Sequence, residues 1–113
     1  MSESVREEIT SAANKVDGVN VTPYFRQVTR PGQGMVRKGR VDYPNTFGGV
    51  VTWQVWILLP QDLASAEKWL DETGAALTAA VSEAMVVRSL TPIIAPDLGS
   101  LPAVVIEGTR EED

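Results

Sequence analysis

The sequence contains neither cysteine nor histidine among its 113 residues. Without cysteine, the chain forms no disulfide and no thiolate metal site. Histidine is the commonest general base and the commonest metal ligand, so an enzyme built from this chain would depend on carboxylates, lysine, tyrosine or serine. These two absences argue against an enzyme.

Long apolar runs and a positive net charge are missing as well. No apolar run reaches the roughly 18 residues of a membrane span, and no signal-peptide core follows Met1. We therefore expect a protein that is made in the cytoplasm and has no membrane partner. The formal net charge of −5 argues against a general nucleic-acid binder. The length favours one domain, residues 1–113, with a single core.

The strongest structural pattern lies between Phe47 and Asp62, where the sequence reads FGGVVTWQVWILLPQD. Glycines open this segment, Pro60 closes it, and β-branched and aromatic residues fill it, which is typical of a strand. One set of alternate positions is wholly apolar: Val51, Trp53, Val55, Ile57 and Leu59. The other set is mixed: Val50, Thr52, Gln54, Trp56 and Leu58. The pattern predicts a central strand with one face in the core.

Two helices are predicted from apolar residues at helical spacing. The first begins at a capping box of Ser4 and Glu7 and ends near a left-handed Gly18. Its apolar face is Val5, Ile9, Ala12, Ala13 and Val16. The second begins after a cap at Asp62 and runs from residue 63 to about residue 85. Its stripe is Leu63, Ala66, Leu70, Leu77, Val81 and Ala84, interrupted by Gly74, which marks a close approach by another element or a kink.

The remaining strands are less distinct. Residues 19–28 form a strand that lies at an edge or is interrupted at Pro23. Residues 35–43 form an exposed strand of a hairpin whose tip is the glycine-rich turn 29–34. Residues 86–94 form a strand broken at Pro92, residues 103–108 a short strand, and residues 109–113 a frayed acidic tail.

The predicted order is α-β-β-β-α-β-β, which indicates an α+β fold. We expect a two-layer sandwich, with a mainly antiparallel sheet of four or five strands and two helices on one face. No catalytic, cofactor or metal site is expected. Turns are favoured over phosphate loops at Gly32-x-Gly34 and Gly48-Gly49. Solvated surface is favoured for Asp71-Glu72, since neighbouring helical residues point apart, and for the acids at 111–113, which belong to the predicted tail.

Basic residues gather in one stretch without an acid among them: Arg26, Arg30, Arg37, Lys38 and Arg40. On a hairpin they would concentrate positive charge at one end of the molecule. Two interpretations stay open. The stretch is an ordinary solvated loop, or it contacts an acidic surface on a neighbouring subunit or nucleic acid, where a ring of copies would multiply the charge.

Trp56 lies on the mixed face of the central strand, for which so short a chain offers no third layer. We expect this side chain to be exposed unless a partner covers it. Large aromatic residues are enriched in interface cores, so Trp56 favours an oligomer.

The order of several segments resembles the tail terminator proteins of long-tailed phages, in particular those that infect actinobacteria. The segments are PYFR (23–26), the basic stretch, FGGVVTWQVWILLPQD (47–62), AEKWLD (66–71), SLTP (89–92) and VIEGTRE (105–111). The LPQD turn after the Trp-x-x-Trp strand and the closing IEGTR are the most specific parts.

The resemblance implies a structural role, with no enzyme activity and no cofactor. Members such as minor tail protein U of phage lambda are α/β subunits, monomeric alone, that form a hexameric ring on the finished tail tube. The ring stops addition of tube subunits and presents a surface to head-completion proteins, and DNA passes transiently through its lumen. The resemblance therefore implies a homo-oligomeric ring in the virion, at the head-proximal end of the tail, with the major tail tube protein and the connector proteins as partners.

Within such a ring, we expect Trp56, Arg26, Arg30, Arg37, Lys38 and Arg40 at contacts between subunits. This role is favoured over lining the lumen, because a basic lining would hinder DNA sliding and charge complementarity fixes the register of contacts. One alternative is a head-completion or tail-to-head joining protein, which would cap the portal side instead of the tube. Another is a small-molecule-binding or enzymatic domain of the same build, because fold does not fix function.

Overall fold

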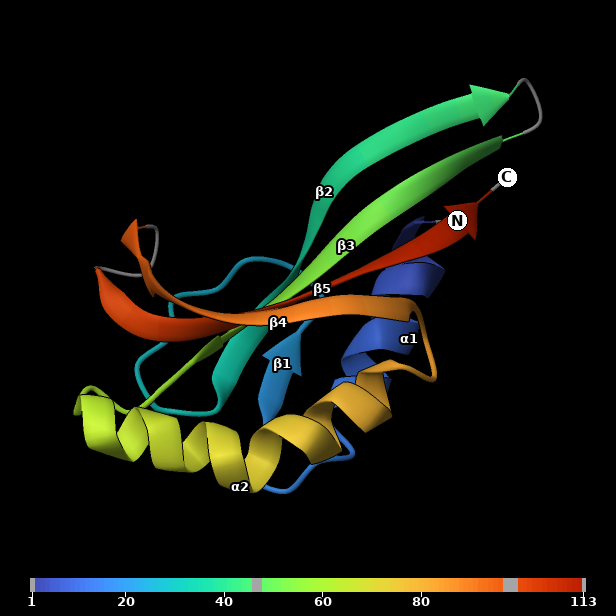
Figure 1. Ribbon diagram of the computed structural model, residues 1–113. Coiled ribbons are helices and arrows are strands. Elements are labelled where there is room, and N and C mark those ends of the chain that lie inside the picture. Colours follow the sequence, from blue (N-terminus) through green and yellow to red (C-terminus); the bar gives the residue numbers. More distant parts are fainter. Residues whose placement is uncertain (1, 46–47, 97–99, 113) are drawn as a thin grey trace.

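The computed structural model describes residues 2–45, 48–96 and 100–112. Its elements are α1 (Ser2–Ala13), β1 (Asn20–Thr22), β2 (Gln33–Asn45), β3 (Gly48–Leu58), α2 (Leu63–Val81), β4 (Val86–Ala95) and β5 (Leu101–Glu112). The strands form one sheet in the order β1-β2-β3-β5-β4. Only β1 and β2 are parallel. The predicted α+β fold and element order are confirmed (Figure 1). None of the described helices is long and apolar enough to cross a membrane.

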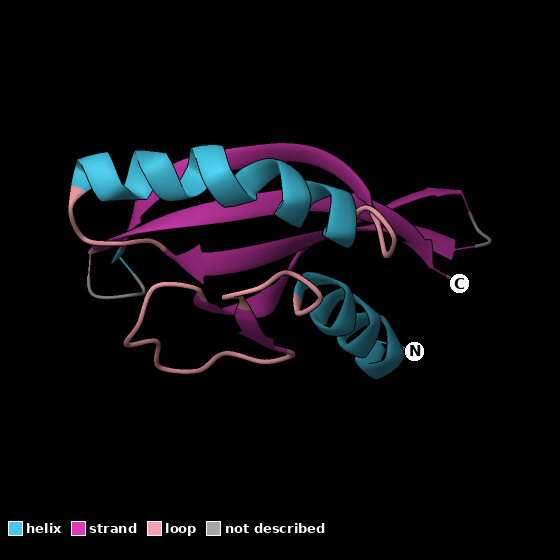
Figure 2. Cartoon of the chain, turned by 90° about the horizontal axis from the view of Figure 1, so that it is seen from below, coloured by secondary structure: helices cyan, strands magenta, loops and turns pink. Residues whose placement is uncertain are grey.

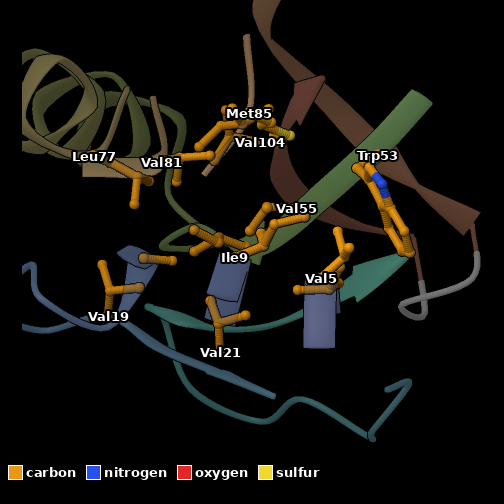
Figure 3. Close-up of a cluster of buried hydrophobic side chains, with 14 of the residues drawn as sticks. Val5, Ile9, Val19, Val21, Trp53, Val55, Leu77, Val81, Met85 and Val104 are labelled. Atoms are coloured by element: carbon orange, nitrogen blue, oxygen red, sulfur yellow. The ribbon is translucent and has the colours of Figure 1, made fainter. Parts of the chain in front are cut away.

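Both helices lie on the same face of the sheet and enclose the main core with it (Figures 1 and 2). The predicted core positions of the central strand, from Val51 to Leu59, are all buried. Figure 3 shows Val55 of β3 beside Ile9 of α1, with Val81 of α2 in the same cluster. This face is called the inner face below.

Helix α1 presents the predicted apolar face to the core, but its ends differ from the prediction. The helix begins at Ser2, so Ser4 lies inside it and the predicted capping box is wrong. It ends at Ala13, and the chain then makes a turn in which Asn14 bonds to both backbone groups of Val21, at 2.7 and 3.0 Å. Gly18 is left-handed as predicted, with φ of +83°, but it lies beyond this turn.

Helix α2 begins as predicted, because the Asp62 carboxylate accepts hydrogen bonds from the backbone N–H and the hydroxyl of Ser65, both at 3.0 Å. The helix ends at Val81, four residues before the predicted end, with Ser82 as its C-cap. Leu63 departs from the buried stripe, since 68 % of it is exposed. Gly74 is buried, yet a Cβ there would meet only Leu90 Cδ1 at 3.7 Å, so no tight approach requires glycine.

The first strands differ from the predicted hairpin. Strand β1 ends at Thr22, which agrees with an interruption at Pro23, and it lies at an edge of the sheet. However, β1 runs parallel to β2, so the turn at 29–34 is not the tip of a hairpin. Strand β2 lies between β1 and β3 and buries Met35 and Val36, so the predicted exposed strand is wrong for its first part, whereas Lys38, Arg40 and Tyr43 are exposed as predicted. The tip that joins β2 to β3 includes residues 46–47, which lie outside the described residues.

The C-terminal strands are longer than predicted. Strand β4 is not broken at Pro92 but continues to Ala95. An edge strand tolerates proline because the backbone groups on its outer side have no neighbouring strand to bond. Strand β4 is the edge opposite β1. Strand β5 continues to Glu112, where it pairs with Gly49 of β3. The predicted frayed tail is therefore wrong, because pairing with the central strand orders these polar residues. Asp113 lies outside the described residues.

Candidate functional site

The face of the sheet opposite the helices, called the outer face below, carries a second and smaller apolar cluster. Its buried members are Val28, Met35, Leu58, Ala95 and Ala103, and Trp56, Ile93 and Leu101 pack against them. Val28 belongs to the loop between β1 and β2. The chain therefore covers part of its own outer face, which corrects the expectation that nothing within the chain covers Trp56. Val28 gave no periodic signal in the sequence because it sits in an irregular loop.

Trp56 is the centre of a chain of polar contacts on the outer face. The guanidinium carbon of Arg37 lies 4.7 Å from the centroid of the Trp56 ring. The indole Nε1 donates to Gln54 Oε1 at 2.9 Å, and Gln54 Nε2 donates to Glu107 Oε2 at 2.9 Å. Strand register explains why these side chains meet, since Gln54 lies opposite Arg37 on one side and Glu107 on the other.

These contacts hold a half-buried indole ring in one orientation. A cation over an aromatic face contributes about 0.5–1 kcal/mol at an exposed site. A side chain that is already ordered loses little entropy when a partner covers it. The outer face thus combines a fixed aromatic ring, an arginine and hydrogen-bonding groups, the composition found at the centres of protein interfaces.

The predicted basic residues do not share one face of the sheet, and the hairpin that was expected to bring them together does not form. Arg37 lies on the outer face, whereas the Nζ of Lys38 lies 5.7 Å from the ring of Trp53 on the inner face. Successive side chains of a strand point to opposite faces, which separates these two neighbours. Arg40 is exposed and pairs with Asp42 at 2.8 Å.

Arg26 and Arg30 belong to the loop between β1 and β2, whereas the other three predicted cations are on β2. Gln33 orders this loop, because its side-chain oxygen accepts hydrogen bonds from the backbone N–H groups of Thr29, at 2.8 Å, and Arg30, at 3.1 Å. Of the five predicted cations, only Arg37 stacks on Trp56 in the contacts described.

Arg6 is a structurally important residue that the sequence did not indicate. It lies on α1, and its Nη1 donates to the carbonyl oxygens of Pro23, at 2.7 Å, and Val36, at 3.0 Å. Its guanidinium carbon lies 4.5 Å from the ring of Tyr24 and 5.2 Å from that of Trp53. One side chain therefore joins α1 to the loop and to two strands. An arginine on a helix gives no sequence signal for such contacts.

The described residues contain no group of three or more acidic side chains that could hold a metal ion. A comparison of the sequence with models of known protein families found no match, and neither did a comparison with curated protein sequences. The resemblance to tail terminators therefore rests on the segments quoted above.

Proposed function

We propose that this protein is a structural virion protein that forms a ring on the head-proximal end of a phage tail. The resemblance implies six copies in that ring. The ring ends polymerisation of the tail tube and presents a surface to the head-completion proteins. Its partners are further copies of the chain, the major tail tube protein and the connector proteins. DNA passes through it only transiently, and no cofactor takes part.

The observation that carries the proposal is the state of Trp56. Arg37 and Gln54 fix this ring on the outer face, yet the protein's own loop covers it only in part. Burying the rest of an aromatic ring that is already ordered is favourable, because the area is large and the entropy loss small. We therefore assign the region around Trp56 and Arg37 as an assembly contact within the ring.

The other predicted cations take different parts in this proposal. Arg26 and Arg30 belong to a loop at the β1 edge, where they can meet an acidic surface of a neighbouring copy. Arg40 already has an acidic partner in Asp42, so it contributes less to contacts between copies. Charge complementarity of this kind fixes orientation more than it adds affinity.

Negative-stain imaging of purified tails, made with and without the protein, tests the proposal. We expect tails of one fixed length with the protein and overlong tubes without it. Tails of normal length that fail to join heads would instead identify a head-tail connector. Tails and particles unchanged by its absence would reject both roles and leave a small-molecule-binding or enzymatic domain to be considered.

A further inference from the structure

An apolar groove runs between α2 and the edge strand β4. Its volume is about 300 Å³, and all of its lining residues are apolar except Glu67. Leu63 of α2 and Ile94 of β4 belong to this lining, and they are 68 % and 57 % exposed. Two large aliphatic side chains that border one groove form a contiguous apolar surface, which is typical of a protein contact site.

Two exposed aromatic residues lie at the opposite edge of the sheet. Tyr24 and Phe25 follow β1 after Pro23 and are 52 % and 61 % exposed. The segment before Phe25 is held in place, since Arg6 bonds to the carbonyl oxygen of Pro23 and Thr22 Oγ1 donates to the carbonyl oxygen of Tyr24 at 2.8 Å. Ordered aromatic residues of this kind act as anchors that fill pockets on a partner.

The two edges also have opposite charge. The loop 23–32 contains Arg26 and Arg30 and no acid. Helix α2, which forms one wall of the groove, contains Glu67, Asp71 and Glu72 against a single base, Lys68. The loop therefore carries positive charge, whereas the apolar groove has Glu67 in its lining and further acids on the helix that forms its wall. Such complementary charge favours one orientation of docking.

Their placement decides what kind of contact they can make. Strands β1 and β4 are the two edges of the sheet. Figure 2 shows the long helix α2 along the upper edge and the loop that follows β1 along the lower edge. A copy can therefore use both surfaces at once, with a different neighbour at each. Contacts between unlike surfaces build rings or open filaments, whereas a two-fold dimer joins identical surfaces.

We propose that Phe25, flanked by Tyr24 and Arg26, docks into the groove between α2 and β4 of a second copy of this chain. This contact rests on the proposed ring and specifies how neighbouring subunits join. The second copy is the occupant because the chain itself supplies the complement to its own groove on the opposite edge. The outer face around Trp56 then remains available for a further contact in the assembly.

Photocrosslinking of the full chain at high concentration tests the contact. A benzophenone amino acid is placed at Phe25, which keeps an aromatic ring there, and at Tyr43 as the control. Tyr43 is 74 % exposed and lies on β2, away from both surfaces. We expect covalent dimers from position 25 in which mass spectrometry finds the bridge on the groove residues, in several-fold excess over the control. No excess, or a bridge from one loop to the same loop, would overturn the proposal.

A pair of variants on β4 provides the second readout. Ile94→Glu places a charge in the groove, whereas Val86→Glu places one at a similarly exposed position, 61 % accessible, on the same strand outside it. Ile94→Glu should lower the dimer yield several-fold, and Val86→Glu should not. Equal yields would contradict the contact. Cross-linked dimers without any tail phenotype would support this contact and reject tail termination. A tail phenotype without the cross-link would support tail termination and reject this contact.

Discussion

Trp53 and Trp56 occupy the same strand but opposite faces of the sheet, and they differ in how far the rest of the protein covers them. Trp53 is fully buried under α1, while Trp56 is half-buried beside a loop. Each ring has an arginine nearby, Arg6 at 5.2 Å and Arg37 at 4.7 Å. The difference lies in what accompanies the arginine. Arg6 belongs to α1, and this helix covers the inner face. Arg37 belongs to the neighbouring strand β2, and the outer face beside it stays partly open.

This comparison separates two uses of an aromatic residue. The inner tryptophan contributes mainly to stability, because its whole surface is removed from water within one chain. The outer tryptophan is ordered but incompletely covered, so part of its apolar surface is left for a partner. The two faces should therefore respond differently to equivalent substitutions.

The largest difference is expected when each ring is removed. Trp53→Ala should lower the free energy of unfolding by about 3–5 kcal/mol, the usual cost of truncating a buried aromatic residue. Trp56→Ala should cost less, about 1–2 kcal/mol, because the ring is already partly in water. Urea denaturation of both variants measures the two losses. Equal losses of unfolding free energy would mean that the protein covers Trp56 as fully as it covers Trp53.

A smaller difference is expected between the two arginines. Arg6→Ala removes two hydrogen bonds to carbonyl oxygens as well as both ring contacts, so we expect a loss of about 1–3 kcal/mol. Arg37→Ala should cost roughly 0.5–1 kcal/mol, the value of an exposed cation–π contact. Thermal unfolding monitored by circular dichroism compares them. If Arg37→Ala proved the more destabilising, Arg37 would have a structural role beyond its contact with Trp56.

The smallest effect concerns packing between α2 and the inner face. Gly74→Ala should raise the free energy of unfolding by up to about 1 kcal/mol, because alanine favours the helix and the added methyl group makes ordinary contact with Leu90. A rise of a few degrees in the melting temperature would agree with this expectation. A fall would show that α2 packs more tightly there than its distance from Leu90 indicates.

The sequence predicted the parts of the fold that depend on local periodicity. The core face of β3 and the apolar faces of both helices repeat at fixed spacing, and the cap at Asp62 depends on a residue three positions away. Nearby residues therefore reveal all of these features. Pairing between distant segments leaves no such trace. The parallel alignment of β1 with β2, and the extension of β5 to Glu112, depend on partners far along the chain.

The candidate site was predicted only in part, for the same reason. Strand alternation placed Trp56 on the outer face, as the structure shows. The sequence could not show that the loop around Val28 folds over that face. The clustering of basic residues was misleading, because Arg37 and Lys38 are adjacent in sequence but lie on opposite faces.

Because Arg37 and Lys38 are adjacent but lie on opposite faces, they form a matched pair for testing whether the outer face is an assembly contact. Tails would be imaged from cells that make either Arg37→Glu or Lys38→Glu protein, after both variants are shown to be folded. We expect overlong tubes with Arg37→Glu and tails of fixed length with Lys38→Glu. Fixed-length tails with both variants would contradict it, and so would overlong tubes with both, because the outer face would then have no special role.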